Sequence, residues 1–137
     1  MLIPEEIHRL IQDEQKKQRG LFIPEDGAYL EKLSCEAELI THQDPNGILG
    51  FVFFYCNAQD KIASYITLIG TSIEARGKGV GYALLNQVLF ISKQRGFSVC
   101  QLEVRKNNIQ ALKFYQKIGF ASIEDRGEKY LMSIQLK

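Results

Sequence analysis

Before residue 36, apolar residues recur at helical spacing between charged ones. Pro4 followed by two glutamates is typical of a helix start, because acidic side chains favour the positive end of the helix dipole. Gly20 is typical of a helix end, and a second helix is expected after Pro24. The apolar residues on the inner faces of the two helices are Ile7, Leu10, Ile11, Tyr29, Leu30 and Leu33. The pattern therefore predicts two amphipathic helices in this region.

From Glu36 the pattern changes to short apolar runs bounded by turn residues. The sequence DPNG, residues 44–47, is a turn signal, and residues 57–61 form another polar break. The runs that these turns separate are residues 37–40, 48–55 and 62–71. Because each run follows the previous one after a short turn, the pattern predicts an antiparallel meander.

The second half of the chain alternates helical and extended patterns. Apolar residues recur at helical spacing over residues 80–91, and Gly96 is expected to end that helix. Another helix is expected over residues 108–118. Strands are expected at residues 99–105, 120–124 and 130–136. The fold class that we predict is α/β (α+β): one mixed domain over residues 1–137, with helices packed on a mostly antiparallel central sheet.

The amino-acid composition narrows the cellular compartment and the classes of binding partner that we expect for the protein. Of the 137 residues, 45% are hydrophobic and 24% are charged, which is ordinary for a soluble globular protein. The 17 basic and 16 acidic residues leave a net charge of +1, which gives no bulk signal for nucleic acid or anionic membranes. The longest apolar run, residues 48–56, is too short to cross a bilayer, and the N-terminus lacks the pattern of a secretion signal. We therefore expect a cytoplasmic protein without nucleic-acid or membrane partners.

Cysteine and histidine usage argues against disulfide and metal chemistry. Cys35, Cys56 and Cys100 stand far apart without a CxxC pair, which fits a reducing compartment better than a disulfide framework. We expect each cysteine to be a small buried hydrophobe. His8 and His42 are also far apart, so no metal site is expected.

The stretch EARGKGVGYALL, residues 74–85, places three glycines between a predicted strand and a predicted helix. Free N–H groups at a helix start attract anions, and glycine lets a phosphate approach the backbone closely. A P-loop is excluded because Lys78 is followed by Gly79, and a dinucleotide fingerprint is excluded because its sixth position from Gly77 is Tyr82. A tight turn that binds no ligand is the alternative.

The spacing that remains is Arg-x-x-Gly-x-Gly, filled by Arg76, Gly79 and Gly81. It resembles motif A of the GCN5-related N-acetyltransferase (GNAT) superfamily, in which this loop holds the pyrophosphate of acetyl-CoA. Residues 108–120, NIQALKFYQKIGF, resemble motif B of the same family. The resemblance covers the chain from Glu36 onward and is weak before it, where the family's usual first strand is missing. It implies a GNAT-like sheet whose strands splay apart at the cofactor site.

The resemblance assigns cofactor-binding roles to two neighbouring segments and to Asn108. Backbone amides and basic side chains of the loop would bind the pyrophosphate, and the preceding strand would pair with the pantetheine arm through Ile69 and Thr71. A backbone N–H near Ile69 would polarise the thioester carbonyl, and Gly70 is compatible with a bulge there. Asn108 would contact the cofactor or cap the helix that follows it. The loop residues expected to bind the cofactor are Arg76, Gly77, Lys78, Gly79, Val80, Gly81 and Tyr82.

Tyr115 and Glu103 are the candidate catalytic residues. The family role of Tyr115 is to protonate the thiolate leaving group, since a phenol is protonated at neutral pH. The alternative is that Tyr115 only packs, with Ala111 and Ile118 on the same helix face. The segment LEVR resembles that of peptide N-terminal acetyltransferases acting on ribosomal proteins, in which the equivalent glutamate is the proposed base. Glu103 is therefore our candidate base, acting through water, and the alternative is a structural ion pair with Arg105 or a lysine.

Two further side-chain positions bear on the chemistry. Cys100 lies on the strand face opposite to Glu103, so we expect direct transfer without a covalent cysteine intermediate. Tyr65, and to a lesser degree Thr67, would line an acceptor pocket.

The implied function is that of an acetyl-CoA-dependent N-acetyltransferase, which moves the acetyl group to a primary amine of a small molecule or peptide in a ternary complex. The alternatives are a non-catalytic acyl-CoA-binding sensor, an O-acceptor or another acyl group. Acidic residues of the first predicted helix would either attract a cationic amine or form a solvated surface. Such folds often form homodimers, and the sequence carries no decisive signal for one.

Overall fold

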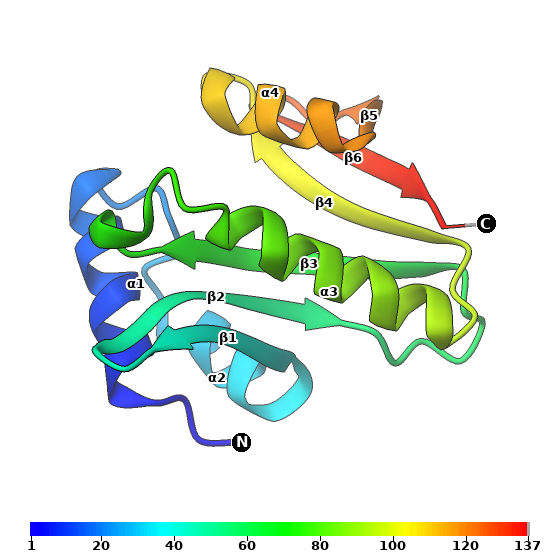
Figure 1. The fold of residues 1–137 in the computed structure, drawn as a ribbon. Helices are drawn as coiled ribbons and strands as arrows, with labels where there is room; N and C mark the ends of the chain where they lie inside the picture. The colour runs from blue at the N-terminus through cyan, green and yellow to red at the C-terminus, as the bar shows by residue number, and fades with distance from the viewer. Residues whose placement is uncertain (137) are drawn as a thin grey trace. The chain divides into compact units, whose positions relative to one another are not determined.

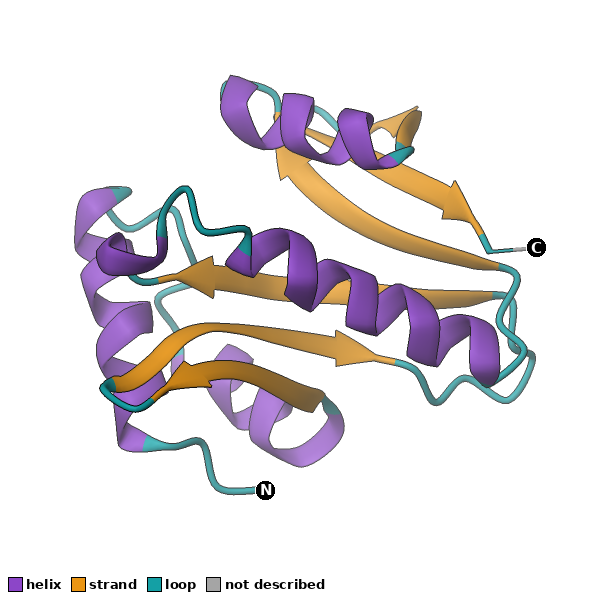
Figure 2. Ribbon diagram, in the orientation of Figure 1, coloured by secondary structure: helices purple, strands orange, loops and turns teal. Residues whose placement is uncertain are grey.

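A computed structural model describes residues 1–136, and Figures 1 and 2 draw its helices and strands. Every helix and strand expected from the pattern is present, and the short 3-10 helix η1 is an addition. In chain order the elements are α1 (Glu5–Lys17), α2 (Gly27–Glu36), β1 (Glu38–Asp44), β2 (Gly47–Tyr55), β3 (Ala63–Thr71), η1 (Ile73–Ala75), α3 (Val80–Gln94), β4 (Val99–Arg105), α4 (Ile109–Ile118), β5 (Ala121–Asp125) and β6 (Lys129–Gln135).

The six strands form one sheet in the order β1-β2-β3-β4-β6-β5. The pairs β1–β2, β4–β6 and β5–β6 are antiparallel, and β3–β4 is parallel. A parallel pair needs a crossover connection, and α3 lies between these two strands in the chain. The mixed, mostly antiparallel sheet confirms the predicted fold class.

The pairing between β3 and β4 ends before either strand does. Its register runs from the pair Ala63–Val99 to the pair Ile66–Leu102, whereas β3 continues to Thr71. The last residues of β3 therefore present an edge that β4 does not pair. Unpaired strand edges of this kind can bind an extended partner through backbone hydrogen bonds.

The described chain divides into two compact units, and each is described by itself. The first comprises Met1–Phe54 and Leu68–Gln87. Its core contains Ile7 and Ile11 of α1, Leu33 of α2 and the buried middle of β2. Three other residues expected on the inner faces of the helices are only partly buried: Leu10, Tyr29 and Leu30. The start of β2 is held to α1, because the Ile48 N–H donates to Glu6 Oε2 at 2.6 Å. A single domain over residues 1–137 stays a prediction.

Close packing in the first unit places the start of α3 against β2. A Cβ atom on Gly50 would lie 2.7 Å from Val80 Cγ1 and 3.1 Å from both the Gly70 carbonyl oxygen and Leu84 Cδ1. Only glycine permits this approach without a shift of the neighbouring atoms. The absence of a side chain at Gly50 therefore lets the first turns of α3 pack directly on β2.

The second unit comprises Tyr55–Thr67 and the chain from Val88 onward. Burial alternates along β4 as the sequence pattern predicts: the side chains of Cys100, Leu102 and Val104 are buried, and those between them are partly exposed. A buried hydrogen bond of 2.7 Å joins the hydroxyls of Ser64 and Ser92. Across residues 1–136, no helix combines the length and apolarity that a membrane span requires.

Candidate functional site

The loop between η1 and α3 contains glycines whose conformation explains their presence. Gly77 and Gly79 have φ angles of +78° and +73°, in the left-handed region that favours glycine. A Cβ atom built at either position has no neighbouring atom within 4 Å. The glycines are therefore required by backbone conformation, and the space beside them is open for a ligand.

Backbone N–H groups of the loop are free to bind an anion. Within residues 1–136, the amides of Gly77 and Gly79 donate to no backbone carbonyl. Val80, Gly81 and Tyr82 form the first turn of α3, where N–H groups have no intrahelical acceptor. These five amides lie at the positive end of a 15-residue helix, which is the arrangement that binds phosphates in other proteins.

Two of the seven expected amides are already engaged. The Arg76 N–H donates to the Ile73 carbonyl at 3.3 Å, and the Lys78 N–H donates to the Ala75 carbonyl at 3.1 Å. Both bonds belong to the turn that leads out of η1. In Arg76 and Lys78, the side chains and not the backbone amides are therefore the groups that could bind an anion.

The Arg76 side chain already has one carboxylate partner in the first unit. Its Nη2 atom lies 3.7 Å from Glu14 Oε1 on α1, and the Arg76 side chain is 53% exposed. Glu14 also accepts a 2.7 Å hydrogen bond from Gln18 Nε2. An exposed ion pair of this length contributes little free energy, so the guanidinium can exchange Glu14 for a phosphate at small cost.

Ile69 and Thr71 lie on the part of β3 that extends beyond its pairing with β4. Both residues are partly exposed. The intervening Gly70 is explained by packing, because a Cβ atom there would lie 2.9 Å from the Phe51 ring. The predicted bulge is therefore not needed to account for this glycine. The strand offers backbone groups to an extended ligand immediately before the glycine loop.

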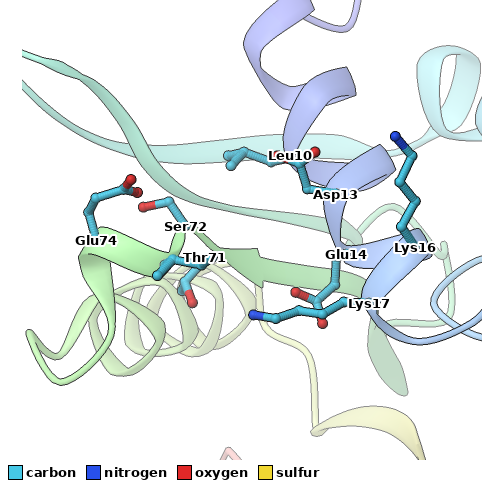
Figure 3. A pocket seen from close by; sticks show the side chains of 9 residues that line it. Leu10, Asp13, Glu14, Lys16, Lys17, Thr71, Ser72 and Glu74 are labelled. Atoms are coloured by element: carbon cyan, nitrogen blue, oxygen red, sulfur yellow. The ribbon is translucent and has the colours of Figure 1, made fainter.

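A pocket of about 470 Å³ opens at the end of β3, between α1 and the segment that leads to the loop (Figure 3). Ser72 lines the pocket, and its buried Oγ atom has no hydrogen-bond partner among the described residues. Thr71 belongs both to the pocket and to the strand expected to bind pantetheine. Tyr65 and Thr67, which were expected to line an acceptor pocket, are not among its lining residues. In the sequence, only the acidic residues of the first predicted helix pointed to this pocket. The lining residues are Leu10, Asp13, Glu14, Lys16, Lys17, Thr71, Ser72, Ile73 and Glu74.

Tyr115 lies in α4 of the second unit and is only 7% exposed. Its ring packs edge-on against Phe114, at a centroid distance of 5.3 Å, and against Phe120 at 5.8 Å. Burial raises the pKa of the Tyr115 phenol to about 12. The side chain is therefore both packed and fully protonated at neutral pH, which fits a proton donor as well as a residue that only packs.

Glu103 lies on β4 with its side chain 27% exposed and two cations beside it. Arg126 Nη1 donates to its Oε2 atom at 3.1 Å, and Lys129 Nζ lies 3.9 Å from its Oε1 atom. Arg105, the expected arginine partner, instead pairs with Glu128 at 3.6 Å. Sequence reasoning missed Arg126 because it depends on the strand register that brings a turn 23 residues away to β4.

Asn108 and Cys100 occupy the structural roles expected of them, whereas Cys35 is exposed and the expectation of a buried residue was wrong there. The Asn108 Oδ1 atom accepts a 3.2 Å hydrogen bond from the Ala111 N–H, so Asn108 caps α4. Cys100 is fully buried, and burial raises the pKa of its thiol to about 11. A buried, protonated thiol is a poor nucleophile.

The candidate residues fall into two groups, one in each unit. The first unit holds the cofactor-binding candidates from Ile69 to Tyr82, and the second holds Glu103, Asn108 and Tyr115. In the part of the chain that is described, no cluster of three or more His, Cys, Asp and Glu side chains could hold a metal ion.

The chain is similar to known acetyltransferases in sequence. An uncharacterized N-acetyltransferase of Methanocaldococcus jannaschii is 32% identical over 80 residues, which are 56% of this chain and 35% of that protein. N-alpha-acetyltransferase 50 of Danio rerio is 36% identical over 75 residues, which are 54% of this chain and 45% of that protein. The chain thus spans less than half the length of these curated relatives.

The fold is also similar to that of a solved structure. A GNAT family acetyltransferase of Elizabethkingia anophelis with acetyl-CoA bound matches with a TM-score of 0.74 and 18% identity, over 98% of this chain and 92% of that chain. The model of the acetyltransferase (GNAT) family matches residues 6–120, which are most of the chain. Together with the glycine loop, the unpaired end of β3 and the mixed sheet, this match shows that the protein belongs to the GNAT acetyltransferase family.

Proposed function

We propose that this protein is an acetyl-CoA-dependent N-acetyltransferase that transfers the acetyl group directly to a primary amine. The observation that carries the proposal is the open glycine loop, in which free amides follow an unpaired strand end. Membership of the GNAT acetyltransferase family and the N-acetyltransferase names of two relatives support it. Acetyl-CoA bound to a protein of similar fold supports the choice of donor.

Cofactor binding falls to the first unit. Amides of the loop and of the first turn of α3 bind the pyrophosphate, with charge from the Arg76 and Lys78 side chains. The β3 backbone at Ile69 and Thr71 binds the pantetheine arm as an added strand. The space beside Gly79 fits this role, because a side chain there would occupy the position of the ligand. Acetyl-CoA supplies the activated acyl group as a thioester.

Proton transfer falls to the second unit. As the amine nitrogen bonds to the carbonyl carbon and the carbon–sulfur bond breaks, Tyr115 gives its phenolic proton to the sulfur and regains one from solvent. Its neutral state at pH 7 suits this role, because an acid must carry its proton when the leaving group forms. Glu103 accepts the proton that the amine loses, through a water molecule. Asn108 holds the start of α4 and contacts the cofactor.

The acceptor enters through the pocket beside α1. Its position at the end of β3 supports this assignment, because Thr71 belongs to both the pocket and the proposed pantetheine strand. The charged lining, with three carboxylates and two ammonium groups, suits a small polar amine or a peptide end. The three free cysteines support a cytoplasmic location.

Release of free thiol from acetyl-CoA tests the proposal. The purified protein is mixed with acetyl-CoA and a panel of amines: peptides with different N-terminal residues, free amino acids, polyamines and amino sugars. We expect thiol release with at least one amine, and mass spectrometry of cell extract with labelled acetyl-CoA identifies the natural acceptor. Tight acetyl-CoA binding without thiol release on any amine or extract would instead indicate a sensor.

A further inference from the structure

The turn between β5 and β6 brings an arginine to the proposed base. Arg126 Nη1 lies 3.1 Å from Glu103 Oε2, and Arg126 Nε donates to Glu124 Oε2. The guanidinium therefore bridges a carboxylate on β4 and a carboxylate on β5. Both carboxylates raise the pKa of Arg126, Glu124 more than Glu103, so the bridge carries a full positive charge at any pH relevant to activity.

The backbone around Arg126 is held by several hydrogen bonds. The Arg126 N–H donates to the Lys129 carbonyl at 2.8 Å, and the Gly127 N–H donates to Asp125 Oδ1 at 3.0 Å. Lys106 binds the turn at two points, with its N–H on the Glu128 carbonyl at 3.0 Å and its Nζ on Asp125 at 2.6 Å. The turn thus gives the guanidinium a fixed starting point.

The other charged groups in this region pair among themselves. Arg105 pairs with Glu128, and Lys106 pairs with Asp125. The groups that face the Glu103 carboxylate are therefore Arg126 on the turn and Lys129 on β6, with Glu124 on β5 acting through Arg126. Two cations therefore face the Glu103 carboxylate, and one of them, Arg126, is shared with Glu124.

These contacts have a consequence for a base. A carboxylate held by an arginine keeps one orientation, since a guanidinium has a planar donor geometry. The second carboxylate, Glu124, holds the same guanidinium from β5, so the arginine itself is held in place.

We propose that Arg126 is a positioning residue for Glu103, and that Glu124 holds the guanidinium in place. Arg126 fixes the orientation of the Glu103 carboxylate as a base. This inference rests on the proposed function, in which Glu103 accepts the amine proton. It places the control of the base on the β5–β6 turn, outside both sequence motifs.

The test compares kcat and KM near neutral pH for the wild type, Arg126→Gln and Glu124→Gln, with the amine that releases thiol fastest in the panel above. In Arg126→Gln we expect kcat to fall about tenfold while the KM values for the amine and acetyl-CoA stay near those of the wild type, because the base is present but no longer oriented. In Glu124→Gln we expect a smaller fall in kcat, because Arg126 loses one of its two carboxylate partners and keeps its contact with Glu103. Arg105→Gln is the matched control, since Arg105 pairs with Glu128 and should leave kcat unchanged.

Conservative replacement and a stability measurement separate positioning from folding. Arg126→Lys keeps the charge and should recover only part of the lost kcat, because one ammonium cannot reproduce the planar contact of the guanidinium. Urea denaturation should give each variant a midpoint close to that of the wild type, because exposed ion pairs contribute little stability. If Arg126→Gln does not fold, Glu124→Gln and Arg126→Lys carry the test alone.

A wild-type kcat in Arg126→Gln would overturn the inference. So would an equal fall of kcat in Arg105→Gln, because the loss would then not depend on the contact with Glu103. Full activity in Glu103→Gln would remove Glu103 as base and the inference with it, while acetyl transfer would stand. Absence of thiol release with every amine would contradict the proposed function itself.

Discussion

At the scale of single residues, the environment of each candidate decides what chemistry its side chain can perform. The Tyr115 phenol is buried among aromatic rings and stays neutral to high pH. Gly79 has a left-handed conformation beside open space, and so combines a backbone requirement with room for a ligand. Cys100 is buried and protonated, which removes the reactive form of its thiol. These surroundings agree with direct transfer that uses an acid and no covalent intermediate.

Gly79→Val should abolish acetyl-CoA binding. The new side chain fills the open space beside the loop amides, and the positive φ strains any residue other than glycine by about 1–2 kcal/mol. Isothermal titration calorimetry should show an acetyl-CoA affinity reduced by roughly two orders of magnitude. Gly96→Val is the matched control, since Gly96 has a φ of +88° at the far end of α3. Gly96→Val should lose a similar amount of stability and keep its affinity for acetyl-CoA. Equal acetyl-CoA affinity in both variants would contradict the role of the glycine loop in binding the pyrophosphate.

Tyr115→Phe should lower kcat and leave acetyl-CoA binding nearly intact. The ring contacts with Phe114 and Phe120 remain, so the free energy of unfolding should change by less than about 1 kcal/mol. Loss of the proton donor should reduce kcat by roughly 100-fold. Steady-state kinetics and calorimetric titration with acetyl-CoA measure the two effects. A variant with wild-type kcat would leave Tyr115 with a packing role only.

Tyr115 should also limit stability at alkaline pH. The pKa of its phenol is about 12 in the folded state and about 10 when unfolded. Below pH 10 the phenol is therefore neutral in both states, and its ionisation costs the folded state no stability. Between pH 10 and 12 the unfolded chain loses the proton first, and the folded state loses up to about 3 kcal/mol of stability. Urea unfolding at pH 9 and at pH 11.5 measures this loss. Tyr115→Phe should lose less stability over that interval than the wild type, and equal losses would contradict the assignment.

At the scale of elements, helix ends supply much of the site. α3 begins in the glycine loop and offers its free amides there. α4 begins at Asn108, whose side chain caps the Ala111 N–H, and Tyr115 follows near the middle of the helix. The unpaired end of β3 adds a strand edge before the loop. Local backbone patterns therefore place most of the donor-binding groups.

Asn108→Ala should weaken α4 by about 1 kcal/mol, because the Ala111 N–H loses its capping acceptor. Asn108→Asp retains an acceptor at the same position and should keep most of that stability. Urea denaturation measures both changes. If Asn108 contacts acetyl-CoA, both variants should bind acetyl-CoA more weakly than the wild type, by more than their change in stability explains. Unaltered affinity in each would leave Asn108 as a helix cap alone.

The sequence predicts these elements well because their signals are local. The glycine loop, the Asn108 cap and the alternation on β4 depend on residues a few positions apart, and each is present in the structure. The Arg126–Glu103 pair and the Ser72 pocket depend on strand register and helix packing across tens of residues. A single sequence does not directly show which distant residues strand register and helix packing bring together. The elements of the proposed donor site could therefore be predicted from the sequence, whereas the surroundings of Glu103 and the pocket at Ser72 could not.

At the scale of the whole molecule, the candidate residues are distributed over two compact units. Motif A and the end of β3 belong to the first unit, and motif B and Glu103 belong to the second. The proposed reaction requires one acetyl-CoA molecule to be served by both groups. Ligand binding stabilises every segment whose ordered state it requires, by an amount set by ligand concentration and affinity. Because of this linkage, measuring which segments acetyl-CoA stabilises tests whether residues of both units serve the ligand.

Hydrogen exchange with and without acetyl-CoA should therefore show protection in both units. At 100 times the dissociation constant, the ligand adds about 2.7 kcal/mol to the free energy of unfolding of whatever it holds folded. We expect slower exchange over the loop amides from Gly77 to Tyr82 and also at the start of α4 around Ala111. Gly79→Val, which should not bind, supplies the control and should show neither effect. Protection confined to the loop would mean that Asn108 and Tyr115 do not serve the cofactor, because a ligand stabilises only the structure that its binding requires.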